Sequence, residues 1–239
     1  MLESVPPTEP TGRKRRSRDE TVAAILRIAR DHLAQTPPDA LSFRAIAREL
    51  DLVSSAVYRY FPSRDALLTA LLVEVYDELG AHVEAADAAV QDRSRTAKRL
   101  AAFTHAIRDW SLAHPNDYAL IYGTPVQGYA APEDTVTPAQ RVTTTLVRIV
   151  ADSWRGRAVP AGETTGTTLR AIVEPVDVFV EDATGTSLPG EVTMRTLMAW
   201  TTIFGTVSFE LWGHYPAELP TSAYMDALID RLARDLGLS

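Results

Sequence analysis

Residues with the chemistry to contact a polyanion gather in the first quarter of the chain. Five of the six residues from Arg13 to Arg18 are cationic, and a group of hydroxyl and guanidinium side chains follows between positions 54 and 60. Such donors bind phosphate oxygens and base edges, and the second group contains no carboxylate that would repel them. Both stretches indicate nucleic-acid binding, although a cationic run can also be a plain solvated segment.

Catalytic and metal-binding chemistry has little support elsewhere in the sequence. The chain has no cysteine, and its five histidines lack the close spacing of metal ligands. It also carries no nucleophile elbow, no Walker A loop and no dinucleotide glycine fingerprint. We therefore expect no enzyme activity, no metal and no cofactor.

The residues at 54–60 belong to a predicted helix-turn-helix that spans Leu41–Phe61. Ser42 is a good N-cap for a first helix that ends near Leu50, and a second helix is predicted at 54–61 after a tight turn. Eight helical residues measure about 12 Å, which matches the width of the B-DNA major groove. The outward side chains of the second helix are those of Ser54, Ser55, Tyr58, Arg59 and Tyr60.

Apolar residues recur at helical spacing through most of the chain, and no alternating strand pattern is sustained. We therefore predict an all-α fold. The predicted parts are a flexible basic arm over 1–18, a helix-turn-helix DNA-binding domain over 19–65, and a helical ligand-binding and dimerisation domain over 66–239. Ser63 is expected to cap a helix that runs to about residue 90. Further helices are predicted at about 95–113, 115–122, 139–154, 167–182, 190–214 and 222–236.

The charge is unevenly divided. The whole chain of 239 residues has a formal net charge of −7, but residues 1–64 hold 11 Arg and Lys against 8 Asp and Glu, whereas residues 65–239 hold 13 against 23. The asymmetry predicts a basic, DNA-facing end on an acidic body.

No apolar run reaches the roughly 20 residues of a membrane span, and no secretory signal is evident, so we expect a cytoplasmic protein that does not contact a membrane.

Two stretches in and after the predicted helix-turn-helix resemble the TetR family of transcriptional regulators. They are Ser42-Phe43-Arg44-Ala45-Ile46-Ala47 and Val57-Tyr58-Arg59-Tyr60-Phe61-Pro62-Ser63-Arg64-Asp65-Ala66-Leu67-Leu68. The resemblance implies phosphate contacts from Ser42, Arg44, Tyr58 and Arg64. It implies groove contacts from Ser54, Ser55, Arg59 and Tyr60, with Arg59 as the foremost base reader because arginine binds guanine bidentately. For Tyr58 and Tyr60, partial packing against the first helix is the alternative.

The resemblance also implies that the basic run is an arm that reaches the minor groove or the DNA backbone, with Arg15, Arg16 and Arg18 as its contacts.

Two positions depart from the family pattern. Asp51 stands where the family usually has glycine, in a position that requires a left-handed backbone, and Asp tolerates that conformation better than most residues. Val53 stands where the family usually has a capping Ser or Thr, and Ser54 or Asp51 is expected to take over the cap.

A second resemblance lies in the C-terminal part. The segments 209–214 and 116–125 are similar to the ligand domain of a TetR subgroup with a Trp-His-Gly signature. His214 is expected in a last helical turn as a structural residue, because a cation suits the negative end of the helix dipole and Pro216 stops the helix.

The family resemblance also implies a homodimer in which the helices at 167–182 and 190–214 form a four-helix bundle with their copies. The expected interface residues are Ile172, Val176, Phe179, Leu197, Phe204 and Leu211. A ligand cavity is expected among aromatic and aliphatic side chains, with His105 or Arg108 as a polar contact, although aromatics at helical spacing often form only core. The expected cavity residues are Phe103, Ile107, Trp110, Tyr122, Val147 and Phe204.

These features predict a ligand-responsive transcriptional repressor. Its expected partners are double-stranded operator DNA with an inverted repeat, a second copy of the chain and an unknown small-molecule effector that releases the DNA. The alternative is a helical small-molecule-binding or protein-interaction module without specific DNA binding.

Overall fold

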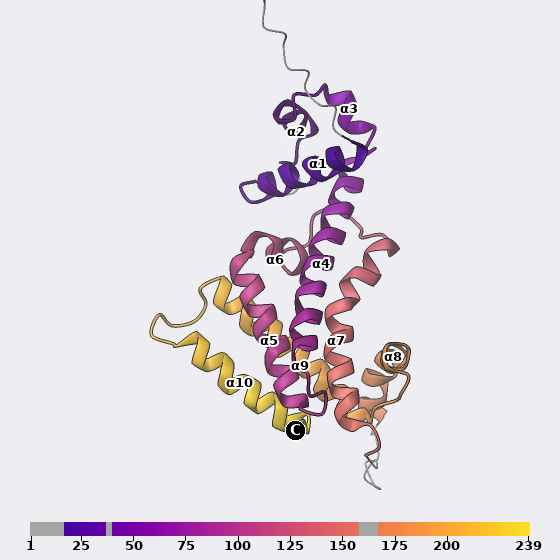
Figure 1. Ribbon diagram of the computed structural model, residues 1–239, viewed down its shortest axis with the longest axis vertical. Coiled ribbons are helices and arrows are strands. Elements are labelled where there is room, and N and C mark those ends of the chain that lie inside the picture. Colours follow the sequence, from indigo (N-terminus) through magenta and orange to yellow (C-terminus); the bar gives the residue numbers. More distant parts are fainter. Residues whose placement is uncertain (1–16, 37–39, 158–166) are drawn as a thin grey trace, which may run out of the picture. The chain divides into compact units, whose positions relative to one another are not determined.

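In the computed structural model, the described residues are 17–36, 40–157 and 167–239, and within these ranges every regular element is a helix (Figure 1). The predicted all-α fold is thereby confirmed. The chain divides into two compact units, residues 1–67 and 68–239. This division falls two residues beyond the boundary expected from the sequence.

The first unit is built on three short helices, α1 (Arg18–Leu33), α2 (Phe43–Glu49) and α3 (Ser54–Tyr58). Helix α1 begins at a capping box, in which Ser17 Oγ accepts from the Glu20 N–H and the Glu20 carboxylate accepts from the Ser17 N–H. Its start therefore lies at Arg18, a residue that the sequence had placed in the flexible arm. The buried core of the unit takes side chains from all three helices: Ile25, Ala29, Ile46, Ala47 and Val57.

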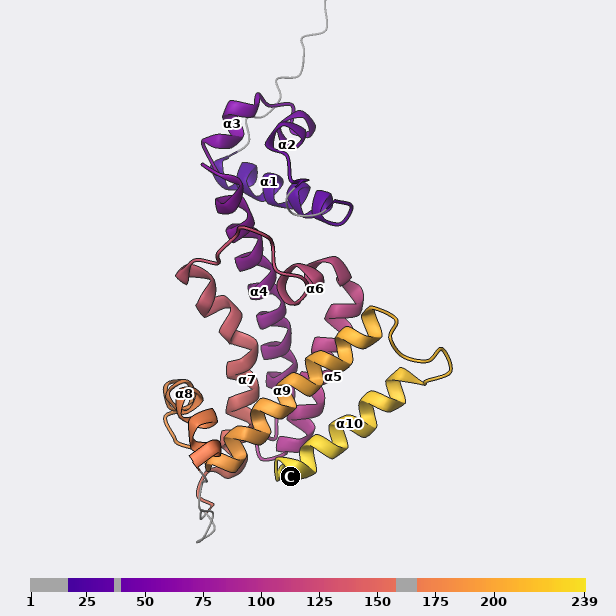
Figure 2. The same cartoon turned by 180° about the vertical axis from the view of Figure 1, so that it is seen from behind.

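Helix α4 (Arg64–Ala89) follows, and the second unit continues with seven further helical elements. These are α5 (Thr96–Ala113), α6 (Pro115–Tyr122), η2 (Glu133–Thr135), α7 (Val136–Trp154), α8 (Thr167–Thr184), α9 (Gly190–Leu211) and α10 (Thr221–Asp235). Helix α5 packs against α7, α9 and α10, and α8 packs against α7 and α9. Figure 2 shows α10 beside α5 and α9 from behind.

The core of the second unit is apolar and takes residues from α4, α5, α7, α9 and α10. Leu79, Leu100, Ile149, Ile203 and Met225 are all fully buried in it. Each of these helices buries one face, which explains why apolar residues recur at helical spacing in its sequence. None of the helices in the described ranges combines the length and apolarity needed to span a membrane.

Helix α9 ends three residues earlier than the sequence predicted. Leu211 is its last residue, and Gly213 has a φ of 67°. The His214 N–H donates to the Phe209 carbonyl at 2.9 Å and the Gly213 N–H donates to the Glu210 carbonyl at 3.2 Å. These two bonds form a Schellman motif. His214 therefore lies beyond the helix rather than in its last turn, which corrects the expectation, because Gly213 supplies the left-handed residue that ends it.

Helices α4 and α7 approach each other closely where α4 carries a glycine. A Cβ atom on Gly80 would lie 2.8 Å from Arg141 Cβ, closer than real Cβ contacts come. Arg141 crosses this point and donates to Asp77 Oδ1 at 2.7 Å and to Glu84 Oε2 at 2.6 Å. Because Gly80 has no side chain, Arg141 of α7 can lie close to α4 and pair with Asp77 and Glu84.

Candidate nucleic-acid interface

Helix α2 presents a capped and cationic N-terminal end. Ser42 Oγ accepts from the Ala45 N–H at 3.4 Å, so the predicted N-cap is confirmed. Because the oxygen accepts this bond, the Ser42 hydroxyl hydrogen remains available to donate to a phosphate. Arg44 is exposed two residues further on. The two residues expected to contact phosphate from this helix are therefore both at the surface.

The turn after α2 has the left-handed residue that the sequence predicted. Asp51 has a φ of 57°, the only positive value at a residue other than glycine in the described part of the chain. The Leu52 N–H donates to the Ala47 carbonyl at 2.8 Å and the Asp51 N–H donates to the Arg48 carbonyl at 3.2 Å. Asp51 thus occupies the position of the usual glycine in a complete Schellman motif, and its presence does not prevent the turn from forming.

Helix α3 is shorter than predicted. It ends at Tyr58 rather than Phe61, and Arg59 is its C-cap. Arg59 and Tyr60 therefore lie in a turn after the helix, where the Tyr60 and Phe61 N–H groups both donate to the Val57 carbonyl. The expected start is correct, but Val53 is the N-cap and supplies no side-chain hydrogen bond to it.

One side of α3 is buried and the other faces solvent. Ala56 and Val57 are buried, Ser54 is half-buried, and Ser55 and Arg59 are exposed. Of the five residues expected to face outward, three are exposed: Ser55, Tyr58 and Arg59. The outward set therefore keeps hydroxyl and guanidinium donors, as a surface for phosphates and base edges requires.

The two tyrosines of this region combine packing with exposure. The Tyr58 ring lies 4.8 Å from the Phe43 ring of α2, although 55% of the residue remains exposed. Tyr60 is half-buried, and the Arg18 guanidinium lies 5.4 Å from its ring centroid. Packing against the preceding helix and access to solvent therefore coexist at Tyr58. Arg18 stacks on Tyr60 at the start of α1, whereas Arg15 and Arg16 lie outside the described residues.

Two further features of this unit had not been expected from the sequence. His32 of α1 and Glu49 of α2 pair at 2.6 Å, which ties the first helix to the helix-turn-helix. Leu52 and Val53 are exposed apolar residues just before α3, and Val53 is 70% exposed. Helical periodicity gives no signal for either feature, because the first joins separate helices and the second lies in a turn.

The boundary of α4 also agrees with the sequence. Ser63 Oγ accepts from the Ala66 N–H at 3.1 Å, so Ser63 caps the helix as predicted. Arg64, which was expected to contact phosphate, is the first helical residue and is exposed. The described residues contain no group of His, Asp and Glu side chains that could hold a metal ion.

The residues expected to line a ligand cavity are packed together in the core of the second unit. Phe103 and Ile107 are fully buried, and Trp110 and Val147 are nearly so. Phe204 packs its ring 4.5 Å from Tyr122. Burial raises the pKa of the Tyr122 hydroxyl well above its usual range. Five of the six thus belong to the buried core of the second unit, and Tyr122 is partly buried against that core.

The two polar contacts expected for a ligand already have partners in the protein. Arg108 Nε and Nη2 donate to the Glu210 carboxylate at 2.7 and 2.6 Å. His105 lies 3.2 Å from Asp226. Two hollows of this unit are lined by other residues, one of about 660 Å³ between α9 and α10 and one of about 470 Å³ at the ends of α4, α5, α7 and α8.

The expected dimer interface is only partly exposed. Ile172 and Leu197 are 38% and 37% exposed, whereas Val176, Phe179 and Leu211 are half-buried against the core of their own unit. Phe204 is 8% exposed and belongs to that core, so its assignment to an outer face is corrected. The large apolar side chains most exposed on α8, on α9 and just after α9 are others: Val178, Met198, Phe209 and Trp212.

The geometry defines a class of protein: an all-α chain whose N-terminal unit is a helix-turn-helix that exposes hydroxyl and guanidinium side chains. The family model "Bacterial regulatory proteins, tetR family" matches residues 25–71, and "Tetracyclin repressor-like, C-terminal domain" matches residues 100–236. The chain belongs to the TetR family and is a transcriptional regulator.

Known relatives agree with this assignment. The chain is 36% identical over 217 residues to HTH-type transcriptional regulator Rv1816 of Mycobacterium tuberculosis, with 88% of each chain covered. The solved structure of a regulatory protein named SCO4313 is 29% identical with a TM-score of 0.72, covering 90% of this chain and 96% of that one. A tetR-family transcriptional regulator from Streptomyces coelicolor shares the fold at 18% identity and a TM-score of 0.56, with 92% and 82% covered.

Proposed function

We propose that the chain is a repressor that binds an inverted-repeat operator as a homodimer and is released by a small-molecule effector. The observation that carries the proposal is the exposed face of the helix-turn-helix. Ser55, Tyr58 and Arg59 point outward there while Ala56 and Val57 hold the helix to its unit. In helix-turn-helix proteins the second helix enters the major groove, and its exposed side chains contact base edges.

Roles within the interface are assigned by position in the family and are consistent with side-chain chemistry. Arg59 is the proposed base reader, because a guanidinium group matches the two acceptors of guanine. Ser42, Arg44, Tyr58 and Arg64 are the proposed phosphate contacts. The cationic run 13–18 is proposed to reach the adjacent minor groove or backbone. Phosphate contacts position the unit, and base contacts give it sequence preference.

The proposed dimer forms through α8 and α9. Met198, Phe209 and Trp212 expose 54%, 51% and 47% of their surface on α9 or just after it, and Gly205 lies between them with open space around the position of a Cβ atom. Large exposed apolar side chains that flank a small residue suit a close helix crossing, and contiguous exposed apolar surface is typical of protein interfaces. A second copy of the chain is the proposed partner.

An effector can release the operator only through a difference in its affinity for the DNA-binding and released states. By linkage, operator DNA must weaken effector binding by the same factor. In a helix-turn-helix dimer the half-sites lie roughly 34–36 Å apart or a multiple of that distance. The proposed effector acts by favouring a half-site spacing that the operator does not have.

Selection of bound sequences from a pool of randomised duplex DNA tests the DNA-binding proposal. We expect enrichment of an inverted repeat with a guanine in each half-site. A pool that stays random after repeated rounds would contradict sequence-specific binding and would favour a helical module without that function. The same selection supplies the operator for the experiments below.

Sedimentation of the full chain tests the dimer proposal. We expect a dimer without DNA and a shift to monomer in Met198→Glu, because a carboxylate would be buried in an apolar contact. Leu112→Glu on α5, where the leucine is 41% exposed, is the matched control and should leave the dimer intact. A monomeric wild-type chain would refute the proposal.

A further inference from the structure

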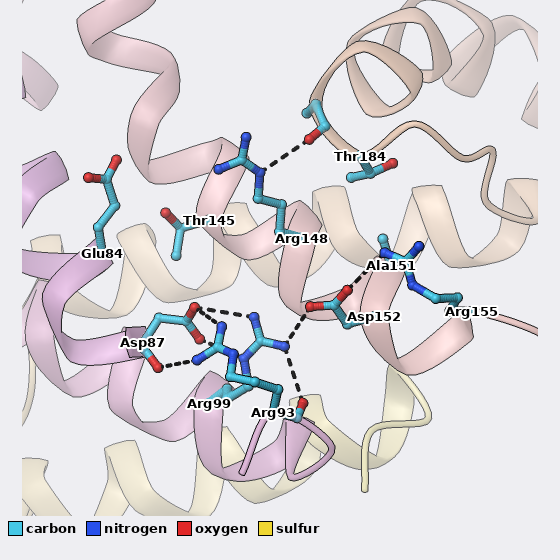
Figure 3. Close-up of a pocket in the computed structure, with 11 residues that line it drawn as sticks. Glu84, Asp87, Arg93, Arg99, Thr145, Arg148, Ala151, Asp152, Arg155 and Thr184 are labelled. Atoms are coloured by element: carbon cyan, nitrogen blue, oxygen red, sulfur yellow. Dashed lines mark hydrogen bonds and ion pairs between the residues drawn. The ribbon is translucent and has the colours of Figure 1, made fainter. Parts of the chain in front are cut away.

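Four arginines line a cavity in the second unit, at the ends of α4, α5, α7 and α8 (Figure 3). Its volume is about 470 Å³, within the range of small-molecule sites. We call it the arginine-lined cavity. The guanidinium groups are those of Arg93, Arg99, Arg148 and Arg155.

Two of the three carboxylates in its wall are occupied by a buried ion-pair network. The Arg99 side chain is 2% exposed and donates to Asp87 Oδ1 at 2.7 Å and to Asp152 Oδ2 at 2.8 Å. Arg93 pairs with the same Asp87, and Arg155 donates to Asp152 at 3.1 Å. Burial works to lower the pKa of Arg99, but the hydrogen bonds and charges of both aspartates outweigh it and the pKa is raised. Three guanidinium groups thus share two carboxylates.

The third carboxylate in the wall, that of Glu84, is paired with an arginine outside the cavity. Glu84 accepts from Arg141 at 3.0 and 2.6 Å, and Arg141 does not line the cavity. Both oxygens of Glu84 are therefore bound by Arg141, which also pairs with Asp77. The guanidinium groups that line the cavity outnumber the carboxylates that line it. This local positive charge contrasts with the net charge of −10 that residues 65–239 carry.

Arg148 differs from the other three arginines of the cavity in its partner, which is a backbone carbonyl. Its Nε donates to the Ala183 carbonyl at 3.1 Å, and among the described residues no carboxylate pairs with its guanidinium group. That bond fixes the guanidinium group beside the end of α8. Figure 3 shows Arg148 across the cavity from Arg99 and Asp87, with Thr145 to one side and Arg155 to the other. No acceptor within the described part of the chain binds the two Nη groups of Arg148, which are therefore positioned to bind an incoming anion.

We propose that the arginine-lined cavity binds a small anion that carries a phosphate or carboxylate group, with Arg148 and Arg155 as its main charge partners. A planar guanidinium group binds the two oxygens of either group side by side, which makes such pairs stronger and more directional than contacts to a point charge. The anion balances the excess positive charge that the Arg99 network leaves. The inference stands independently of operator binding and of effector release.

Thermal unfolding of the full chain, titrated at constant ionic strength with inorganic phosphate or with succinate against chloride, tests the site. Binding to the folded state raises the melting temperature in a saturable way. We expect a saturable rise with at least one of the two anions in the wild-type chain. In Arg148→Gln the dissociation constant should rise about ten- to a hundredfold, since a charge-assisted hydrogen bond is lost. A response to one anion alone supports the site and identifies the group that it prefers.

Arg231→Gln is the matched control, because Arg231 is an exposed arginine that pairs with Asp235 at 3.3 Å on the same helix. Its dissociation constant should equal that of the wild-type chain. Arg148 is at the surface, so Arg148→Gln should melt at the wild-type temperature without anion. The inference is overturned if neither anion gives a saturable rise, or if Arg148→Gln responds as the wild-type chain does, which would place the anion elsewhere.

Discussion

Replacing Glu210 by glutamine isolates the energetic role of an ion pair that joins α5 to α9. The Glu210 carboxylate accepts from Arg108 Nε at 2.7 Å and from Arg108 Nη2 at 2.6 Å, in the bidentate arrangement. The side chains of Arg108 and Glu210 are only 13% and 11% exposed. Glutamine keeps the shape and one acceptor oxygen but removes the negative charge, so the arginine is left in a largely dry site without its partner.

The size of the effect follows from this burial. Removing one partner of a buried pair costs about 3–5 kcal/mol because it leaves an uncompensated charge. The small residual exposure and the remaining acceptor bring the expected loss of unfolding free energy to about 2–4 kcal/mol. For a unit of this size each kcal/mol lowers the melting temperature by about 2–4 °C. We therefore expect Glu210→Gln to melt about 4–16 °C below the wild-type chain.

Differential scanning calorimetry between pH 3 and pH 7 is the assay. The hydrogen bonds from Arg108 hold the pKa of Glu210 below its ordinary value of 4.5. A carboxyl group with a lowered folded-state pKa stabilises the fold fully above its ordinary value and loses that contribution as the pH falls through the lowered value. The difference between wild type and Glu210→Gln should thus be constant at neutral pH and shrink below about pH 4.5.

Asp235→Asn is the control, because its pair with Arg231 is exposed at 70% and 50% and such pairs contribute at most about 0.5 kcal/mol. The reasoning is refuted if Glu210→Gln melts within about 2 °C of the wild-type chain at pH 7, or if the difference stays the same at pH 3.

Three further predictions concern single residues: Gly80, Asp51 and Val53. Gly80→Ala should destabilise the chain by about 1–3 kcal/mol in urea unfolding, because the new Cβ would lie 2.8 Å from Arg141 Cβ; a gain in stability, as helix propensity alone predicts, would contradict the close approach. Asp51→Ala should be about 1 kcal/mol less stable than Asp51→Gly, because alanine is strained in the left-handed backbone and glycine is not; equal stabilities of the two variants would show that the backbone is not the cause. Val53 is 70% exposed just before α3, and we expect it to contact a thymine 5-methyl group; replacing that thymine by uracil in the selected operator should weaken binding about fourfold, since one methyl contact is worth about 0.8 kcal/mol. That effect should vanish in Val53→Ser, and its persistence would exclude the contact.

Local rules predicted a large part of the fold. Ser42 and Ser63 were recognisable as N-caps because their hydroxyls satisfy free backbone N–H groups of the following helix, and both do so. The left-handed backbone at Asp51 could be predicted because the resemblance places a glycine there, and Asp tolerates that conformation better than most residues. These predictions succeeded because each depends on neighbours within a few positions along the chain.

Features set by contacts between distant residues were harder to predict. Phe204 lies on a helix that is apolar on several faces, so the sequence could not tell its core face from its outer face, and it was assigned to both a cavity and an interface. Helix α3 ends at Tyr58 although the apolar spacing continues to Phe61. The network around Arg99 joins α4, α5 and α7, and no spacing along the sequence marks it.

Binding of the selected operator by Arg59→Ala tests the central claim most directly. The measurement is the set of dissociation constants, by fluorescence anisotropy at fixed salt, for the selected operator and its single-base variants. If Arg59 reads a guanine, the variant should lose about 1–3 kcal/mol of discrimination at one position of each half-site and keep its preferences elsewhere. Arg27→Ala, which removes an exposed arginine paired with Asp31 on α1, should leave every preference unchanged. Unchanged discrimination in Arg59→Ala would contradict the claim that this face of the helix-turn-helix reads the operator.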